Sequence, residues 1–125
     1  MAEEKKDPLY KSFGYAFEGI FAGIRKERNM KIHCTAAVLV VCAGLVFQIS
    51  LVKWCLCLIL FGLVMALELV NTAVEAVVDL VTDEYKPLAK LAKDTAAGAV
   101  LIAAIMAAIT GCLIFIPEIM EFFAG

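Results

Sequence analysis

The chain has 125 residues, enough for one domain, and 63% of them are hydrophobic. A soluble domain is about 45–50% apolar, and a chain this short cannot bury so much apolar surface in a core of its own. The composition therefore indicates a membrane protein, organised as a single domain over residues 1–125. The net charge is −2, and the basic residues flank the apolar segments, which argues against a nucleic-acid partner.

The first predicted element is an amphipathic helix over about residues 8–26. Its large apolar side chains recur at helical spacing on one face, at Leu9, Phe13, Phe17, Ile20 and Ile24. Polar and basic residues occupy the rest of its circumference. Such a helix lies in the membrane surface with its apolar face toward the lipid. A soluble helix that binds a partner is the alternative.

Three long apolar segments follow, over about residues 31–50, 52–81 and 87–116. Each is long enough to cross a bilayer, which needs roughly 20 helical residues. Pro87 fits the first turn of the last helix, and that helix is expected to end before Pro117. The predicted fold is an all-α integral membrane protein, with a surface helix and three transmembrane helices.

The distribution of basic residues predicts the orientation of these spans. Basic residues are frequent before the first span, at Lys5, Lys6, Lys11, Arg25, Lys26, Arg28 and Lys31. Lys53 alone lies between the first and second spans, whereas Lys86, Lys90 and Lys93 lie around the second loop. Because basic residues favour the cytoplasmic side, the N-terminus and the second loop are predicted to be cytoplasmic and the C-terminus to lie outside.

Small residues recur every four positions along the third span, at Thr95, Ala99, Ala103, Ala107 and Gly111. A seam of this kind lets helices approach closely in lipid. With three spans per chain, the seam suggests an oligomer. The alternative is that alanine is simply the best helix former.

An acidic stripe is the strongest functional signal. Glu68, Asn71, Glu75 and Asp79 lie at helical spacing and share one face of the second predicted span. A charge inside a membrane costs at least a few kcal/mol. A solvated helix end would explain Asp79 but explains Glu68 poorly, so the stripe predicts a functional site.

The chemistry best matched by this stripe is phosphoryl transfer. Mg²⁺ prefers one or two carboxylates together with substrate phosphates, and the transfer also needs a base and nearby cations. Glu27, just before the first span, adds a carboxylate, and Lys90 and Lys93 add cations. Glu68 is predicted to lie about 10 Å deeper than Glu75, by the rise of an α-helix.

Familiar soluble-enzyme signatures are missing from the sequence. It contains no G-x-x-x-x-G-K-[ST] segment and no protein-kinase signature set. It also lacks a Ser/His/Asp arrangement, because its only histidine is His33, which is interpreted as a structural group near the membrane interface.

Two linked segments resemble a known family. Residues 68–79 (ELVNTAVEAVVD) and 89–100 (AKLAKDTAAGAV) are similar to the signature of the prokaryotic diacylglycerol kinase and undecaprenol kinase family. The resemblance covers residues 10 to about 116. Residues 29–33 (NMKIH) and 85–90 (YKPLAK) look like the Gram-positive undecaprenol kinase branch.

The resemblance implies a homotrimer that uses ATP and Mg²⁺, with active sites shared between neighbouring chains. By position in the motifs, Glu68 corresponds to the general base at the lipid substrate, Asn71 supports it, and Glu27 and Glu75 bind metal. The residues implied at the nucleotide are Tyr15, Glu27, Glu75, Asp79, Glu84, Tyr85, Lys86, Lys93 and Asp94.

The expected function is the ATP- and Mg²⁺-dependent phosphorylation of undecaprenol to undecaprenyl phosphate at the cell membrane. A diacylglycerol kinase that makes phosphatidic acid is the first alternative. A small proton-coupled transporter, with Glu68 as its intramembrane proton site, is the second. A non-catalytic subunit of a membrane assembly is the third.

Overall fold

The computed structural model describes residues 6–125. Residues 1–5, which the sequence analysis placed in the single domain and which include Lys5, lie outside this range. The described chain forms four helices, α1 (Leu9–Lys26), α2 (Arg28–Phe47), α3 (Leu51–Val81) and α4 (Pro87–Ala124). The predicted helices are thus present, with small shifts at most of their ends.

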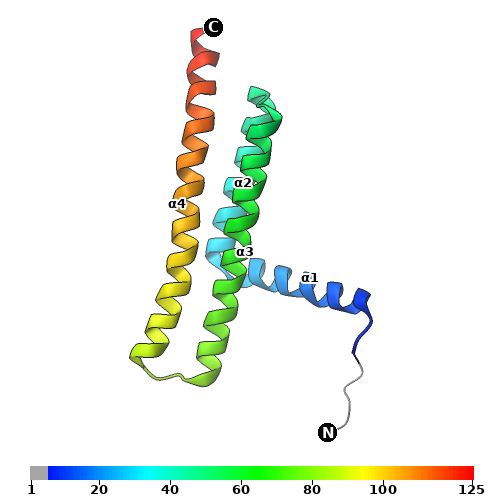
Figure 1. Cartoon of the computed structure of the whole chain (residues 1–125), viewed down its shortest axis with the longest axis vertical. Coiled ribbons are helices and arrows are strands. Elements are labelled where there is room, and N and C mark those ends of the chain that lie inside the picture. Colours follow the sequence, from blue (N-terminus) through cyan, green and yellow to red (C-terminus); the bar gives the residue numbers. More distant parts are fainter. Residues whose placement is uncertain (1–5) are drawn as a thin grey trace.

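The three long helices form a bundle, and α1 leaves it sideways (Figure 1). The hairpin of α3 and α4 is the most extensive contact in the bundle, and α2 packs more sparingly against both of them. A single extended residue, Glu27, separates α1 from α2. Because only one residue intervenes, the chain turns sharply there and α1 is held at the side of the bundle.

The turn between α2 and α3 is tightly built. Gln48 adopts a left-handed conformation with φ 51°, and the amide of Ile49 donates to the carbonyl of Gly44 at 3.2 Å. This is the hydrogen bond of a Schellman cap. Ser50 then caps α3 by accepting from the amide of Lys53. A Cβ on Gly44 would lie 2.5 Å from the Trp54 ring, so glycine is what lets the two helices close together here.

The expected end of the last span before Pro117 is wrong, because α4 continues through this proline to Ala124. The continuation is held by its contacts with the neighbouring helices. The Lys53 ammonium donates to Glu118 at 2.7 Å, and the Phe122 ring packs edge-on against Phe47 with centroids 5.8 Å apart. These contacts offset the hydrogen bond that the proline removes, as neighbouring helices commonly do in membrane proteins.

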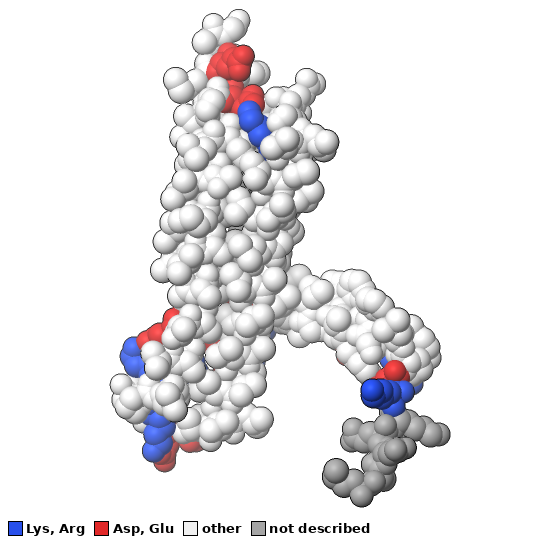
Figure 2. All heavy atoms as spheres, viewed as in Figure 1, with Lys and Arg blue, Asp and Glu red and all other residues white. Residues whose placement is uncertain are grey.

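The long helices are suited to a lipid environment. Within residues 6–125, α2, α3 and α4 are each long and apolar enough to cross a membrane. Large apolar side chains point outward along them, including Leu58, Ile59 and Ile102. Figure 2 shows charged groups near the ends of the bundle and near the free end of α1, with an uncharged band between. A soluble surface would not carry so much contiguous apolar area.

The small-residue seam of α4 faces largely into its own chain. Ala103 is buried, and Ala107 and Gly111 line a cavity between α2, α3 and α4. The seam therefore allows close packing within one bundle. An oligomer does not follow from it.

Candidate active site

A buried carboxylate lies at the centre of the bundle. Glu68 is 1% exposed and Asn71 is 5% exposed, and both project from α3. Among the described residues, neither carboxylate oxygen of Glu68 nor the side-chain oxygen of Asn71 has a hydrogen-bond partner. Buried polar groups are normally paired, because leaving them unpaired costs several kcal/mol at most sites. Unpaired acceptors here indicate a site built for a ligand or substrate rather than for stability.

These acceptors face a cavity of about 300 Å³. Glu68 and Asn71 form its α3 wall, and Asn29 and His33 line it from α2. The α4 wall is mostly small and apolar, at Ala97, Val100, Leu101 and Ala104. The cavity thus combines a few convergent polar groups with an apolar lining, as small-molecule sites generally do.

His33 is a site residue that the sequence analysis missed. Its Nε2 atom lies 3.7 Å from a carboxylate oxygen of Glu68, so the imidazole is a polar neighbour of the buried acid. The position of His33 in the sequence could have indicated this role. Apart from cysteines, no ionisable side chain lies deeper in the first span than His33. A polar group at that depth is a functional candidate by default.

The junction of α1 and α2 is brought beside the same acid. Gly23 is buried against α3, and a Cβ on it would lie only 2.6 Å from the Leu69 side chain. This close approach places Glu27 at the edge of the site.

Glu27 and Glu75 are the residues that could hold a divalent cation. Glu75 is half-buried and accepts a 3.4 Å hydrogen bond from the Asn71 amide. Within residues 6–125, no three or more His, Cys, Asp or Glu side chains converge as a metal cage. A pair of carboxylates suits Mg²⁺, which completes its shell with phosphate oxygens and water.

A second group of predicted residues gathers where α3 meets α4. A cavity of about 280 Å³ is lined there by charged and polar side chains, which include Asp79, Glu84, Tyr85, Lys86, Lys93 and Asp94. Lys93 donates to Asp79 at 2.6 Å, and Lys86 pairs with Glu84 at 3.3 Å. A further ion pair joins Lys90 to Asp94. These groups are exposed and already paired with one another.

Tyr15 is not brought to either group within this chain. It is 55% exposed on α1, and its hydroxyl donates to Asp7 at 3.1 Å. Asp79 lies roughly 16 Å from Glu68 along α3 by the helical rise. The structure therefore brings Glu68 and Asn71 into one cavity, joins Glu75 to Asn71 by a hydrogen bond, and collects the loop residues in a second cavity. Glu27 lies between α1 and α2 and lines neither cavity, and Tyr15 lies outside both.

Comparisons with known proteins agree with this arrangement. The family described as prokaryotic diacylglycerol kinase matches residues 14–115. An undecaprenol kinase of Bacillus subtilis is 46% identical over 111 residues, which cover 89% of this chain and 90% of the relative. A diacylglycerol kinase of Synechocystis is 42% identical over 90% of this chain and 65% of the relative. A diacylglycerol kinase of Escherichia coli is 35% identical over 85% of this chain and 87% of the relative.

The match covers most of the chain and contains every residue of the buried site. It confirms the resemblance drawn from residues 68–79 and 89–100. It also favours a kinase, with ATP as the phosphate donor, over the transporter and the non-catalytic subunit. With its three membrane-spanning helices, this chain is a multi-pass membrane lipid kinase that belongs to the prokaryotic diacylglycerol kinase family.

Proposed function

We propose that this chain transfers the γ-phosphate of ATP to the terminal hydroxyl of undecaprenol. The observation that carries the proposal is the unpaired Glu68 carboxylate, buried at a cavity whose α4 wall is apolar. An alcohol at the head of a long hydrocarbon would meet both surroundings at once. The similarity to the undecaprenol kinase of Bacillus subtilis supports this acceptor.

In this mechanism Glu68 is the general base. Its carboxylate accepts the proton of the lipid hydroxyl while that oxygen forms a bond to the γ-phosphorus, and the bond from the γ-phosphorus to the bridging oxygen of ADP breaks. A lipid that fills the cavity displaces water from it, so the lipid oxygen becomes the available nucleophile. Asn71 positions Glu75 through its amide and can also orient the substrate hydroxyl through its free oxygen.

The cofactor is proposed to be Mg²⁺, held by Glu27 and Glu75. When bound, it supplies positive charge to the phosphate oxygens. Glu27 directly follows the last residue of α1, and Glu75 lies about two helical turns beyond Glu68 on the same face of α3. These two carboxylates would therefore lie at the edge of the buried cavity that is nearest to water. The ATP phosphates would then lie between this edge and the exposed cavity.

The nucleotide is proposed to bind at the exposed cavity where α3 meets α4. Lys93 and Lys86 supply positive charge for the phosphates; Asp79 holds Lys93 in place and Glu84 holds Lys86, while Asp94 pairs with Lys90. Tyr85 offers an aromatic face for the base. Tyr15 would contribute only if α1 of one chain reached the site of another.

The proposed topology places this nucleotide cavity in the cytoplasm, where ATP is available. The N-terminus and the α3–α4 connection then lie inside and the C-terminus outside, as the basic residues predict. In Figure 1, α3 and α4 extend beyond the level of α1 on the side of this connection. With α1 as an amphipathic helix in the membrane surface, the connection would project into water. A homotrimer is proposed from the family resemblance.

The proposal is tested with the purified protein in detergent, supplied with Mg-ATP and with undecaprenol or diacylglycerol in parallel. We expect a higher kcat/KM for undecaprenol. A higher value for diacylglycerol would favour the second candidate function, which is supported by the relatives from Synechocystis and Escherichia coli. Phosphorylation of neither lipid would contradict the kinase reaction itself.

A further inference from the structure

The surface helix touches the bundle closely at a glycine. Gly23 is buried, whereas the other residues of α1 are half-buried or exposed. A Cβ on Gly23 would lie 2.6 Å from the Cδ2 atom of Leu69, but a Cβ on Gly19, one turn earlier in α1, would meet nothing within 4 Å. Leu69 directly follows Glu68 in the sequence of α3, so α1 reaches α3 beside the buried acid.

This contact is connected to Glu27 through the backbone. The carbonyl of Gly23 accepts a 3.0 Å hydrogen bond from the amide of Glu27, which is the single residue between α1 and α2. Glu27 is extended, with φ −99° and ψ 122°, and no flexible linker separates it from either helix. A shift of the end of α1 on α3 therefore moves Glu27 as well.

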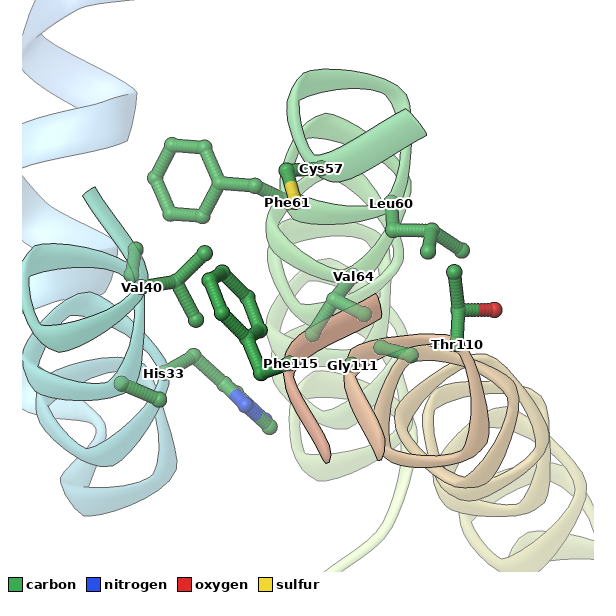
Figure 3. A pocket seen from close by; sticks show the side chains of 12 residues that line it. His33, Val40, Cys57, Leu60, Phe61, Val64, Thr110, Gly111 and Phe115 are labelled. Atoms are coloured by element: carbon green, nitrogen blue, oxygen red, sulfur yellow. The ribbon is translucent and has the colours of Figure 1, made fainter. Parts of the chain in front are cut away.

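Glu27 has a second anchor on the side of α2. Met30, three residues later, is 0% exposed, and its burial fixes the first turn of α2. Farther along α2 the packing is looser, because a cavity of about 120 Å³ lies between α2, α3 and α4. Figure 3 shows this cavity, which His33 and Val40 line from α2. The position of Glu27 thus depends on the two buried residues nearest to it in the chain, Gly23 and Met30.

We propose that the contact between Gly23 and Leu69 positions Glu27 for metal binding, which makes Gly23 a positioning residue for phosphoryl transfer. This inference rests on the proposed function, because Glu27 is proposed there as a ligand of Mg²⁺. The absence of a side chain at Gly23 lets the backbone of α1 approach α3 through the space that a Cβ would fill. A larger residue at this position would push the end of α1, and Glu27 with it, away from α3.

Gly23→Val tests the contact, because its added carbons overpack a place where a Cβ alone would come within 2.6 Å of Leu69. Leu69→Ala removes as many carbons as Gly23→Val adds. The double variant therefore conserves the volume of the contact and should let α1 return to α3. Gly19→Val is the matched control, since it makes the same change in the same helix at a position where a Cβ meets nothing.

The first readout is metal binding without turnover. Electron paramagnetic resonance measures the affinity for Mn²⁺ in the presence of a non-hydrolysable ATP analogue. Gly23→Val should bind Mn²⁺ about 10- to 100-fold more weakly than the wild type, the usual effect of losing a group that orients a metal ligand. The double variant should recover most of this affinity, so that the effects of the two single changes do not add. Gly19→Val should match the wild type.

The second readout separates positioning from a general loss of structure. In kinase assays Gly23→Val should raise the Mg²⁺ concentration needed for half-maximal turnover about 10- to 100-fold, with an unchanged KM for the lipid. Thermal unfolding in detergent checks that each protein is folded. If Gly23→Val does not fold, Gly23→Ala, which adds a single carbon, replaces it in both assays with the same expected directions.

The outcomes distinguish this inference from the proposed function. If Gly23→Val binds Mn²⁺ as tightly as the wild type while Glu27→Gln binds it more weakly, Glu27 remains a metal ligand and the positioning inference fails. If the double variant stays as weak as Gly23→Val, the contact with Leu69 is not the cause and the inference also fails. If Glu27→Gln itself binds Mn²⁺ as tightly as the wild type, the proposed metal site fails, and this inference fails with it.

Discussion

Helix α3 carries two acidic regions that differ sharply in their surroundings. Near its middle, Glu68 is 1% exposed and its oxygens have no hydrogen-bond partner among residues 6–125. Near its end, the side chains of Asp79 and Lys93 are 64% and 40% exposed and pair at 2.6 Å. A carboxylate is therefore buried without a hydrogen-bond partner in one region, and exposed and paired with a lysine in the other, within roughly 16 Å of helix.

This difference indicates a division of labour between the two regions. A buried carboxylate without partners is costly to stability, and it is available to accept a proton from a substrate that excludes water. An exposed network of ion pairs contributes little to stability, but it holds several cations in one place for a phosphorylated ligand.

The buried region should be indispensable for turnover. Glu68→Gln keeps the shape of the side chain but removes its ability to accept a proton, so kcat should fall by about 10²- to 10⁴-fold, the usual contribution of a general base. The initial rate of lipid phosphorylation measures this effect. Glu121→Gln, the same change at an exposed position near the end of α4, is the control and should retain the wild-type rate.

Glu68→Gln should also remain folded, because an amide needs less solvation than a carboxylate. A thermal transition in detergent equal to or above that of the wild type would show this. Robust phosphorylation by Glu68→Gln would contradict its role as the base.

The exposed region should act on nucleotide affinity instead. Lys93→Met removes one cation from the loop cavity and leaves Asp79 without its partner. We expect the KM for ATP to rise about tenfold, with the KM for the lipid unchanged, since a hydrogen bond between charged groups contributes about 1.5 kcal/mol. Lys6→Met, near the N-terminus, serves as the control. An unchanged KM for ATP would remove Lys93 from the nucleotide site.

His33 should assist Glu68 in catalysis without acting as the base itself. Because its imidazole lies 3.7 Å from the Glu68 carboxylate, His33→Phe removes the polar neighbour that stabilises the ionised acid. We expect kcat to fall about tenfold, equivalent to ~1.4 kcal/mol, with the KM for ATP unchanged. His33→Asn, which restores a polar side chain, should recover part of the loss. Identical rates for both variants and the wild type would assign His33 a structural role only.

The smallest effect concerns the α2–α3 turn, which is far from both regions. Gln48 has a φ of 51°, a conformation that disfavours any residue with a Cβ. Relief of this cost, about 1–2 kcal/mol, outweighs the about 0.4–1 kcal/mol of entropy that glycine adds to the unfolded chain. Gln48→Gly should therefore stabilise the protein by about 0.5–1 kcal/mol without changing its kinetics. Thermal unfolding in detergent checks this, and Gln48→Ala, which keeps the Cβ, should give no such gain. A loss of activity in Gln48→Gly would link the turn to the site.

Much of the fold follows from the sequence, because long apolar segments can only be helices in a bilayer. The prediction failed at Pro117, where local propensity was outweighed by contacts to Lys53 and Phe47 from other helices. Such contacts join residues far apart in the chain, and no local pattern records them. The start of α2 at Arg28 rather than near residue 31 likewise depends on the single-residue turn at Glu27.

The acidic stripe was also predictable, since Glu68, Asn71 and Glu75 share a helix face by their spacing alone. The contact between His33 and Glu68 was not, because it depends on how α2 is rotated against α3.

The division between the two regions is tested most directly by measuring the affinity for a non-hydrolysable ATP analogue with Mg²⁺ in Glu68→Gln and Lys93→Met side by side. We predict that Glu68→Gln binds the analogue as tightly as the wild type while its turnover is lost. Lys93→Met should bind it about tenfold more weakly. If Glu68→Gln weakens nucleotide binding as much as Lys93→Met does, the buried acid belongs to the nucleotide site and the account is contradicted.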